Sequence, residues 1–183
     1  VDTSNFMDVQ FFFLCLILYF TFSRSECPCP KHYTGPESWN DDKHWMVRDI
    51  VIRMVQGVYV LCVRFKGIKQ DPRVERPTAR GDGSDPLASQ QGGSDWSYIG
   101  DVPNSILSPF MWYRYLMSFY DGPRMPTDPF FLDSTRTKPF LYSAANRLLK
   151  SLVGRVQEDT DFAMHSFRVE GYNRAKLVGG EDL

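Results

Sequence analysis

The sequence predicts an α+β fold, mainly helical, with a small antiparallel sheet of two or three strands. Three observations support this prediction. A strongly apolar run, Phe11–Phe20, predicts a buried helix. Two short runs rich in β-branched and aromatic residues, Trp45–Ile52 and Val58–Phe65, predict neighbouring strands. Two later stretches, Ile106–Tyr120 and Tyr142–Val156, have the apolar spacing of helices that cover a core.

Length and composition agree with one ordinary domain. The chain has 183 residues, of which 43% are hydrophobic and 15% aromatic, so it has the material for a core that disordered proteins lack. Its net charge of -1 provides no general attraction to nucleic acid. A site for a polyanion must therefore come from local clustering of charge, and basic residues do gather between Lys43 and Arg80.

The apolar run near the amino terminus is expected to be a core helix. Phe11–Phe20 and its flanks are shorter than the roughly 20 apolar residues that a membrane-spanning helix needs. Asp2 and Asp8 precede the run where a signal peptide has basic residues. We expect this helix to pack against Ile106–Tyr120 or Leu148–Val156.

Turn-forming residues divide the first half of the chain. Cys27-Pro28-Cys29-Pro30 stops any helix and opens a polar loop. Met54–Gly57 is the expected hairpin turn between the two strands, and Lys66–Pro72 is a second turn, after which Val74 opens a third strand. Residues 80–95, which read RGDGSDPLASQQGGSD, predict a flexible surface loop.

The second half begins with a helix over Ile106–Tyr120 that starts at a Ser-Pro pair and is ended by Gly122-Pro123. Phe130-Phe131-Leu132 predicts a short, buried, extended segment. The helix over Tyr142–Val156 has Ser143 as its expected cap.

Cysteine usage indicates a reduced protein without a structural metal. Four cysteines are too few and too unevenly placed for a disulfide scaffold. Cys27 and Cys29, with His32 nearby, suggest a zinc site, but only Cys62 and His44 are otherwise at hand to complete four ligands. We therefore expect neither a metal nor another cofactor.

Near the carboxyl end, His165-Ser166-Phe167-Arg168 offers a candidate site for phosphate. In a helix, His165 and Arg168 share one face. Arginine has a planar fork of donors that fits two phosphate oxygens, and histidine adds a single donor. Arg24 follows the apolar run, where a rigid support would direct it into a cleft, although it could instead bind the helix-end carbonyls. A His-Arg pair one turn apart is also common on solvated helix faces.

Three segments in this order correspond to one family. They are FTFSRSE at Phe20–Glu26, VRFKGIKQDP at Val63–Pro72 and MHSFRVEGYNRAK at Met164–Lys176. With these segments, the chain resembles the catalytic domain of tyrosine recombinases, the phage-integrase-like enzymes that break and rejoin DNA. It is most similar to those of mobile elements in protists and algae. The resemblance covers the chain from about Phe11 to its end.

The resemblance implies roles for particular residues. Arg24 and Arg168 would clamp the scissile phosphate, and His165 would be their hydrogen-bonding and acid/base partner. Lys66 would be the general acid for the leaving 5′-hydroxyl, with Lys69 as the alternative. Further DNA contacts are expected from Arg64, Arg73 and Lys176.

The chain also departs from the family's pattern. In the family a second His or Trp, and then the tyrosine nucleophile, follow the HxxR motif, whereas here Leu183 comes soon after Arg168. Tyr172 lies one turn beyond Arg168, and a nucleophile must attack in line with the leaving group. The helical DNA-binding domain that precedes the family's catalytic domain is also missing or lies before Val1. We therefore expect residues 1–183 to be one incomplete recombinase-type catalytic domain that binds DNA without cleaving it alone.

The expected partner is duplex DNA, with a homo-oligomer on DNA left open, and neither a membrane nor a small-molecule substrate is expected. The expected location is the nucleus in a eukaryote and otherwise the cytoplasm. Two other interpretations stay open. One is a non-catalytic domain that kept the fold to interact with DNA or protein. The other is a membrane-associated protein anchored by Phe11–Phe20.

Overall fold

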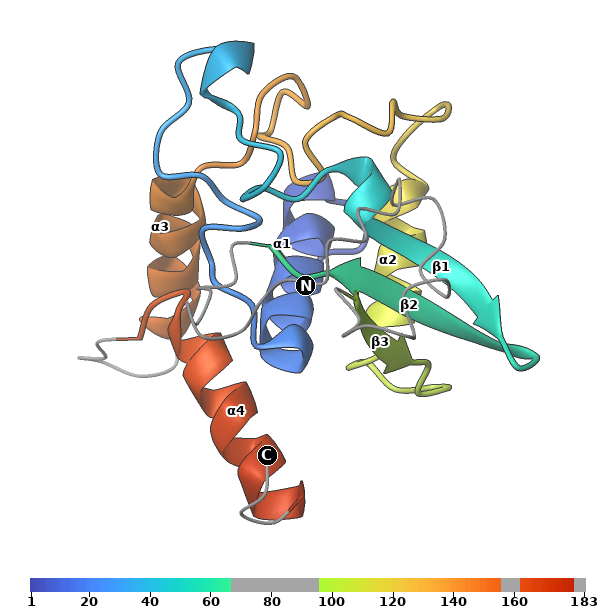
Figure 1. Cartoon of the computed structure of the whole chain (residues 1–183). Coiled ribbons are helices and arrows are strands. Elements are labelled where there is room, and N and C mark those ends of the chain that lie inside the picture. The colour runs from blue at the N-terminus through green and yellow to red at the C-terminus, as the bar shows by residue number, and fades with distance from the viewer. Residues whose placement is uncertain (67–95, 156–161, 180–183) are drawn as a thin grey trace, which may run out of the picture.

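The computed structural model describes residues 1–66, 96–155 and 162–179 (Figure 1). These residues form an α+β fold with a three-stranded antiparallel sheet in the order β1-β2-β3, as the sequence predicts. The helices are α1 (Phe6–Thr21), α2 (Pro109–Met117), α3 (Tyr142–Val153) and α4 (Ser166–Gly179), and the strands are β1 (Ile50–Val55), β2 (Val58–Arg64) and β3 (Trp96–Gly100).

Helix α1 runs through the centre of the molecule (Figure 1). The Asn5 side chain accepts hydrogen bonds from the backbone N–H groups of Met7 and Asp8, at 2.9 and 3.3 Å, and so caps the first turn. The prediction of a buried helix is confirmed, because most of its apolar side chains are buried and it packs against α2. Among the described residues, no helix combines the length and apolar character needed to cross a bilayer.

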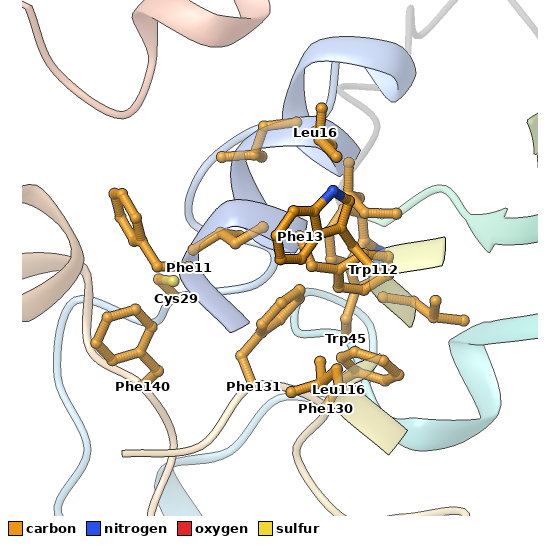
Figure 2. Packing of buried hydrophobic residues seen from close by; sticks show 14 of the residues in the cluster. Phe11, Phe13, Leu16, Cys29, Trp45, Trp112, Leu116, Phe130, Phe131 and Phe140 are labelled. Carbon is orange, nitrogen blue, oxygen red and sulfur yellow. The ribbon is translucent and has the colours of Figure 1, made fainter. Parts of the chain in front are cut away.

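The core is rich in aromatic rings (Figure 2). Phe13 of α1 lies 5.9 Å from Phe130 and 6.0 Å from Phe131, measured between ring centroids. Both of these partners are fully buried, and Leu132 is nearly so, which confirms the buried segment predicted there. Burial of each such side chain stabilises the fold by about 1.5 to 3 kcal/mol relative to exposure.

One polar side chain within this core joins α1 to the Phe130–Leu132 segment. The Gln10 amide donates through Nε2 to the Leu132 carbonyl at 2.6 Å and accepts at Oε1 from the Leu132 N–H at 2.8 Å. Gln10 is fully buried. Because the segment belongs to no helix or sheet, its backbone needs other partners, and one amide satisfies both groups of Leu132.

The predicted hairpin forms with a tight turn. Strands β1 and β2 pair from Ile50↔Val63 to Val55↔Val58. Gln56 and Gly57 form the turn with positive φ angles of 50° and 79°, the combination that matches the twist of two-residue hairpins.

The first strand begins later than the sequence suggests. Val47–Asp49 forms a short 3-10 turn before β1. The turn closes because the Asp49 carboxylate accepts from the Met46 N–H at 2.9 Å. Trp45, which we expected in the strand, is instead fully buried in the core.

The third strand comes from a part of the chain to which the sequence assigned none. Strand β3 pairs antiparallel with β2, with Leu61 opposite Ile99. The strand expected at Val74 and the loop expected over residues 80–95 lie outside the described residues.

Two helices are shorter than predicted. Helix α2 begins at Pro109, as the Ser-Pro pair indicates, and Ser108 Oγ accepts from the Met111 N–H at 3.2 Å. It ends at Met117, before the Gly122-Pro123 pair that we expected to stop it.

Helix α3 ends at Val153, and the prediction that Ser143 caps it is wrong. Leu141 occupies the cap position, with extended backbone and no side-chain hydrogen bond. Its carbonyl accepts from the N–H groups of Ala144 and Ala145, so Ser143 already lies within the first turn.

Candidate functional site

Helix α4 leaves the body of the molecule at a steep angle, and it packs chiefly against α1 (Figure 1). Gly171 makes this contact close. A Cβ atom at this position would clash with the carbonyl oxygen of Tyr19 and would lie 3.0 Å from the ring of Phe22. The glycine therefore lets α4 approach the last turn of α1 more closely than any residue with a side chain could.

This approach leaves an open cavity of about 380 Å³ between the two helices. The described residues that line it are Phe22, His165, Arg168, Val169 and Tyr172. His165 and Arg168 therefore share one face, as the sequence predicts. Both residues are exposed, and the structure shows no hydrogen bond or ion pair from either side chain to another described residue.

Arg24 lies near this cavity but is not part of its lining. Helix α1 ends at Phe22, whose φ of 52° turns the chain away from the helix axis. Chain geometry keeps the Cα atom of Arg24 within about 7 Å of that of Phe22. Arg24 is exposed. The structure thus brings the segment with Arg24 to the same end of α1 as His165 and Arg168.

Lys66 lies in a different environment from the one expected of a residue in a surface turn. Its side chain is only 6% exposed, and its Nζ atom is 2.9 Å from Oδ2 of the fully buried Asp49. Nζ also donates to the Asp41 carbonyl at 2.7 Å. Arg64 Nη1 lies 3.8 Å from the other Asp49 oxygen. A buried carboxylate needs nearby cations, so Lys66 has a clear structural role.

Cys27 connects this ion cluster to the turn after α1. Its Sγ lies 3.6 Å from the Lys66 carbonyl, and its N–H donates to the Arg24 carbonyl at 2.9 Å. Burial raises the pKa of the Cys27 thiol to about 11. The candidate residues therefore form two groups, one around Lys66 and one around His165 and Arg168. The backbone of Arg24 is linked to the first group through Cys27. Phe22, two residues before Arg24, lines the cavity of the second group.

The remaining predicted DNA contacts have different surroundings. Arg64 is 30% exposed beside Asp49. Lys176 is exposed on α4, with its Nζ 5.1 Å from the centroid of the Tyr172 ring. Lys69 and Arg73 lie outside the described residues.

The cysteines that suggested a zinc site lie in buried surroundings. Within residues 1–66, 96–155 and 162–179, no group of three or more His, Cys, Asp or Glu residues is placed to hold a metal ion. Burial raises the pKa of Cys27 and raises that of Cys29 well above its ordinary value, and both shifts disfavour the thiolate form that binds zinc.

The sequence missed three of the residues around the cavity, namely Phe22, Val169 and Tyr172. Gly171 was the available signal, because an isolated glycine inside a helix often marks close packing. The sequence also missed Asp49 as the partner of Lys66, because the burial of this carboxylate depends on the fold.

Comparison with known proteins does not assign the chain to a family. No family model matches it, and neither a curated protein nor a solved structure does. The function must therefore be argued from the geometry of this site and from the residues that form it.

Proposed function

We propose that this chain is a DNA-binding module of the recombination and integration type, with a core like that of tyrosine recombinases. In this proposal Arg168 and His165 bind one phosphate of the DNA backbone, and Arg24 approaches it from the end of α1. The supporting observation is that His165 and Arg168 line one exposed cavity beside the segment that carries Arg24, and that the described residues of this lining include no carboxylate.

The chemistry of these groups suits a phosphodiester. A guanidinium forms two parallel hydrogen bonds to phosphate oxygens, which are stronger than bonds between neutral groups. Histidine adds a further donor from the same face of α4. In a strand-transfer reaction, such fixed donors stabilise the charge that develops on the phosphoryl oxygens.

In this proposal the general acid is Lys66 or Lys69. Lys66 would have to leave Asp49 before it could protonate a 5′-hydroxyl, and the buried carboxylate would then lose its nearest cation. Lys69 remains the alternative. Tyr172 lies on the same helix face as His165 and Arg168, which is unsuited to attack in line with a leaving group. We therefore propose that this chain alone binds DNA without forming a covalent bond to it.

The salt dependence of binding to a duplex oligonucleotide tests the proposal. The logarithm of the binding constant should fall linearly with the logarithm of salt concentration, by about 0.9 per phosphate contacted. Arg168→Ala should weaken binding and reduce this slope by about 1. Arg174→Ala is the matched control, because Arg174 lies on the opposite face of α4 and is already paired with Glu170 at 2.9 Å.

Two results would count against the proposal. One is binding that does not respond to salt, and the other is an equal loss of affinity in Arg168→Ala and Arg174→Ala. A separate assay on a nicked suicide substrate addresses covalent chemistry. We expect no protein-DNA adduct that survives denaturation, and an adduct at Tyr172 would show that this tyrosine is a nucleophile.

An interaction with another protein is the second candidate function. Leu177 and Val178, near the end of α4, are 78% and 89% exposed. Apolar side chains so exposed on a projecting helix are typical of a surface that a partner covers. In that case binding to DNA would be weak and would not depend on Arg168.

A further inference from the structure

The cavity between α1 and α4 contains a corner made of two aromatic rings. Phe22 and Tyr172 lie 6.3 Å apart between ring centroids, with an angle of 85° between their planes. A flat ring that stacks on the face of one of these two residues meets the edge of the other, and both the stacked and the edge-to-face contact are favourable for aromatic rings. Val169 adds an apolar surface to the same lining. The cavity is therefore suited to a flat, partly apolar group.

The same face of α4 carries positive charge along its length. His165, Arg168, Tyr172 and Lys176 recur at the spacing of one helix face, which we call the basic-aromatic stripe. Lys176 Nζ lies 5.1 Å from the Tyr172 ring centroid. Two features of the stripe thus occur together: cations that attract phosphates and a ring on which a base can stack.

The acidic residue of the helix lies away from this stripe. Glu170 is on the opposite face, where it pairs with Arg174 at 2.9 Å. Its charge is therefore largely neutralised, and the stripe has no described carboxylate within the cavity lining. Charge complementarity favours an anion that also has a flat ring, which is the chemistry of a nucleotide.

We propose that the cavity binds one unpaired nucleotide of DNA. The base stacks in the corner of Phe22 and Tyr172, its phosphate binds Arg168 and His165, and Lys176 contacts a neighbouring phosphate. A paired base cannot bind this way, because its faces are covered by stacking within the duplex. This inference rests on the proposed function, since it uses the same phosphate-binding pair, and it names the form of DNA that the site prefers.

The test compares two DNA molecules of the same sequence. One is a fully paired duplex with 2-aminopurine in place of one adenine, and the other carries the same 2-aminopurine as a single-nucleotide bulge. The protein should bind the bulged DNA roughly fivefold or more tightly, as expected from stacking of one base. Binding should quench the fluorescence of the bulged 2-aminopurine and leave that of the paired one unchanged.

Variants of Tyr172 identify the ring that stacks. Tyr172→Phe keeps the aromatic face and should retain the preference and the quenching. Tyr172→Leu keeps apolar contact with Phe22 and should lose both the preference for the bulged DNA and the quenching. If Tyr172→Leu fails to fold, the affinities of the unchanged protein for the two DNA molecules still show whether it prefers an unpaired nucleotide.

The possible failures can be told apart. Equal affinity for both DNA molecules, without quenching, would overturn the unpaired-nucleotide site. If Arg168→Ala still weakens binding to the duplex, the proposed function is retained. Binding to both molecules that is insensitive to Arg168→Ala would overturn the proposed function. A preference for the bulge that persists in Tyr172→Leu would also refute the site described here.

Discussion

Replacement of Gly171 by alanine tests the contact that forms the cavity. In an isolated helix this change stabilises by about 0.8 to 1.0 kcal/mol, because alanine has the higher helix propensity. In this protein the new Cβ would clash with the Tyr19 carbonyl oxygen and press against the Phe22 ring at 3.0 Å. A backbone oxygen cannot rotate away, so α4 must move.

The two effects oppose each other and the clash should dominate. Overpacking of a close contact costs typically about 1 to 3 kcal/mol, which leaves a net destabilisation of about 0 to 2 kcal/mol. Because α4 contacts the body chiefly through α1, most of this cost should appear as separation of α4 and not as global unfolding. The cavity would open, and affinity for DNA would fall with it.

Amide hydrogen exchange measures the separation of α4 from the body, and urea denaturation measures global unfolding. We expect faster exchange in α4 of the Gly171→Ala variant with little change in the urea midpoint. Asn173→Ala, at an exposed position of the same helix, is the control: it raises helix propensity without a clash and should not accelerate exchange. The reasoning is refuted if Gly171→Ala stabilises the protein by about 1 kcal/mol and leaves exchange in α4 and DNA affinity unchanged.

Three further predictions concern the body of the protein. Gln10→Leu should lower the free energy of unfolding by about 2 kcal/mol or more, because it leaves the buried N–H and C=O of Leu132 without partners. Urea denaturation measures this loss, and an unchanged midpoint would contradict the prediction. Lys66→Met should destabilise the protein, toward the lower end of about 3 to 5 kcal/mol, because it removes the nearest cation from the buried Asp49 carboxylate and leaves Arg64 at 3.8 Å. A change confined to DNA affinity would indicate instead that Lys66 is free to act in chemistry. Burial, assisted by Lys43, lowers the pKa of His44 below its ordinary value of 6.5. The unfolded chain therefore binds the proton more tightly, and the free energy of unfolding should decline as pH falls below about 6.5. His44→Gln should reduce this decline, and a pH profile identical to that of the unchanged protein would contradict the prediction.

Local patterns in the sequence were sufficient for some elements and insufficient for others. The apolar run predicted α1 because a helix that is apolar on most sides must be buried. The Ser108-Pro109 pair indicated that a helix begins near this point, because both residues act within the first turn, although the range that we predicted from apolar spacing began three residues earlier, at Ile106. Strand β3 was missed because it depends on pairing with β2, a contact between distant parts of the chain that no local periodicity records.

The candidate site divides in the same way. The shared face of His165 and Arg168 follows from helical spacing alone. The position of Phe22 against Tyr172 depends on how α1 meets α4, which requires the fold. The burial of Lys66 likewise depends on Asp49, which precedes it by a whole hairpin. The arrangement of functional side chains along one helix was therefore predictable from the sequence. The residues that other elements place beside them were not.

The most direct test of the central claim is a double-mutant cycle of Arg24→Ala and Arg168→Ala, measured as affinity for duplex DNA at fixed salt. If both arginines bind the same phosphate, the second substitution costs less once the first has been made. The coupling energy should then be about 0.5 kcal/mol or more. Costs that add within about 0.3 kcal/mol would show that the two residues act at separate places, which would contradict a shared phosphate site.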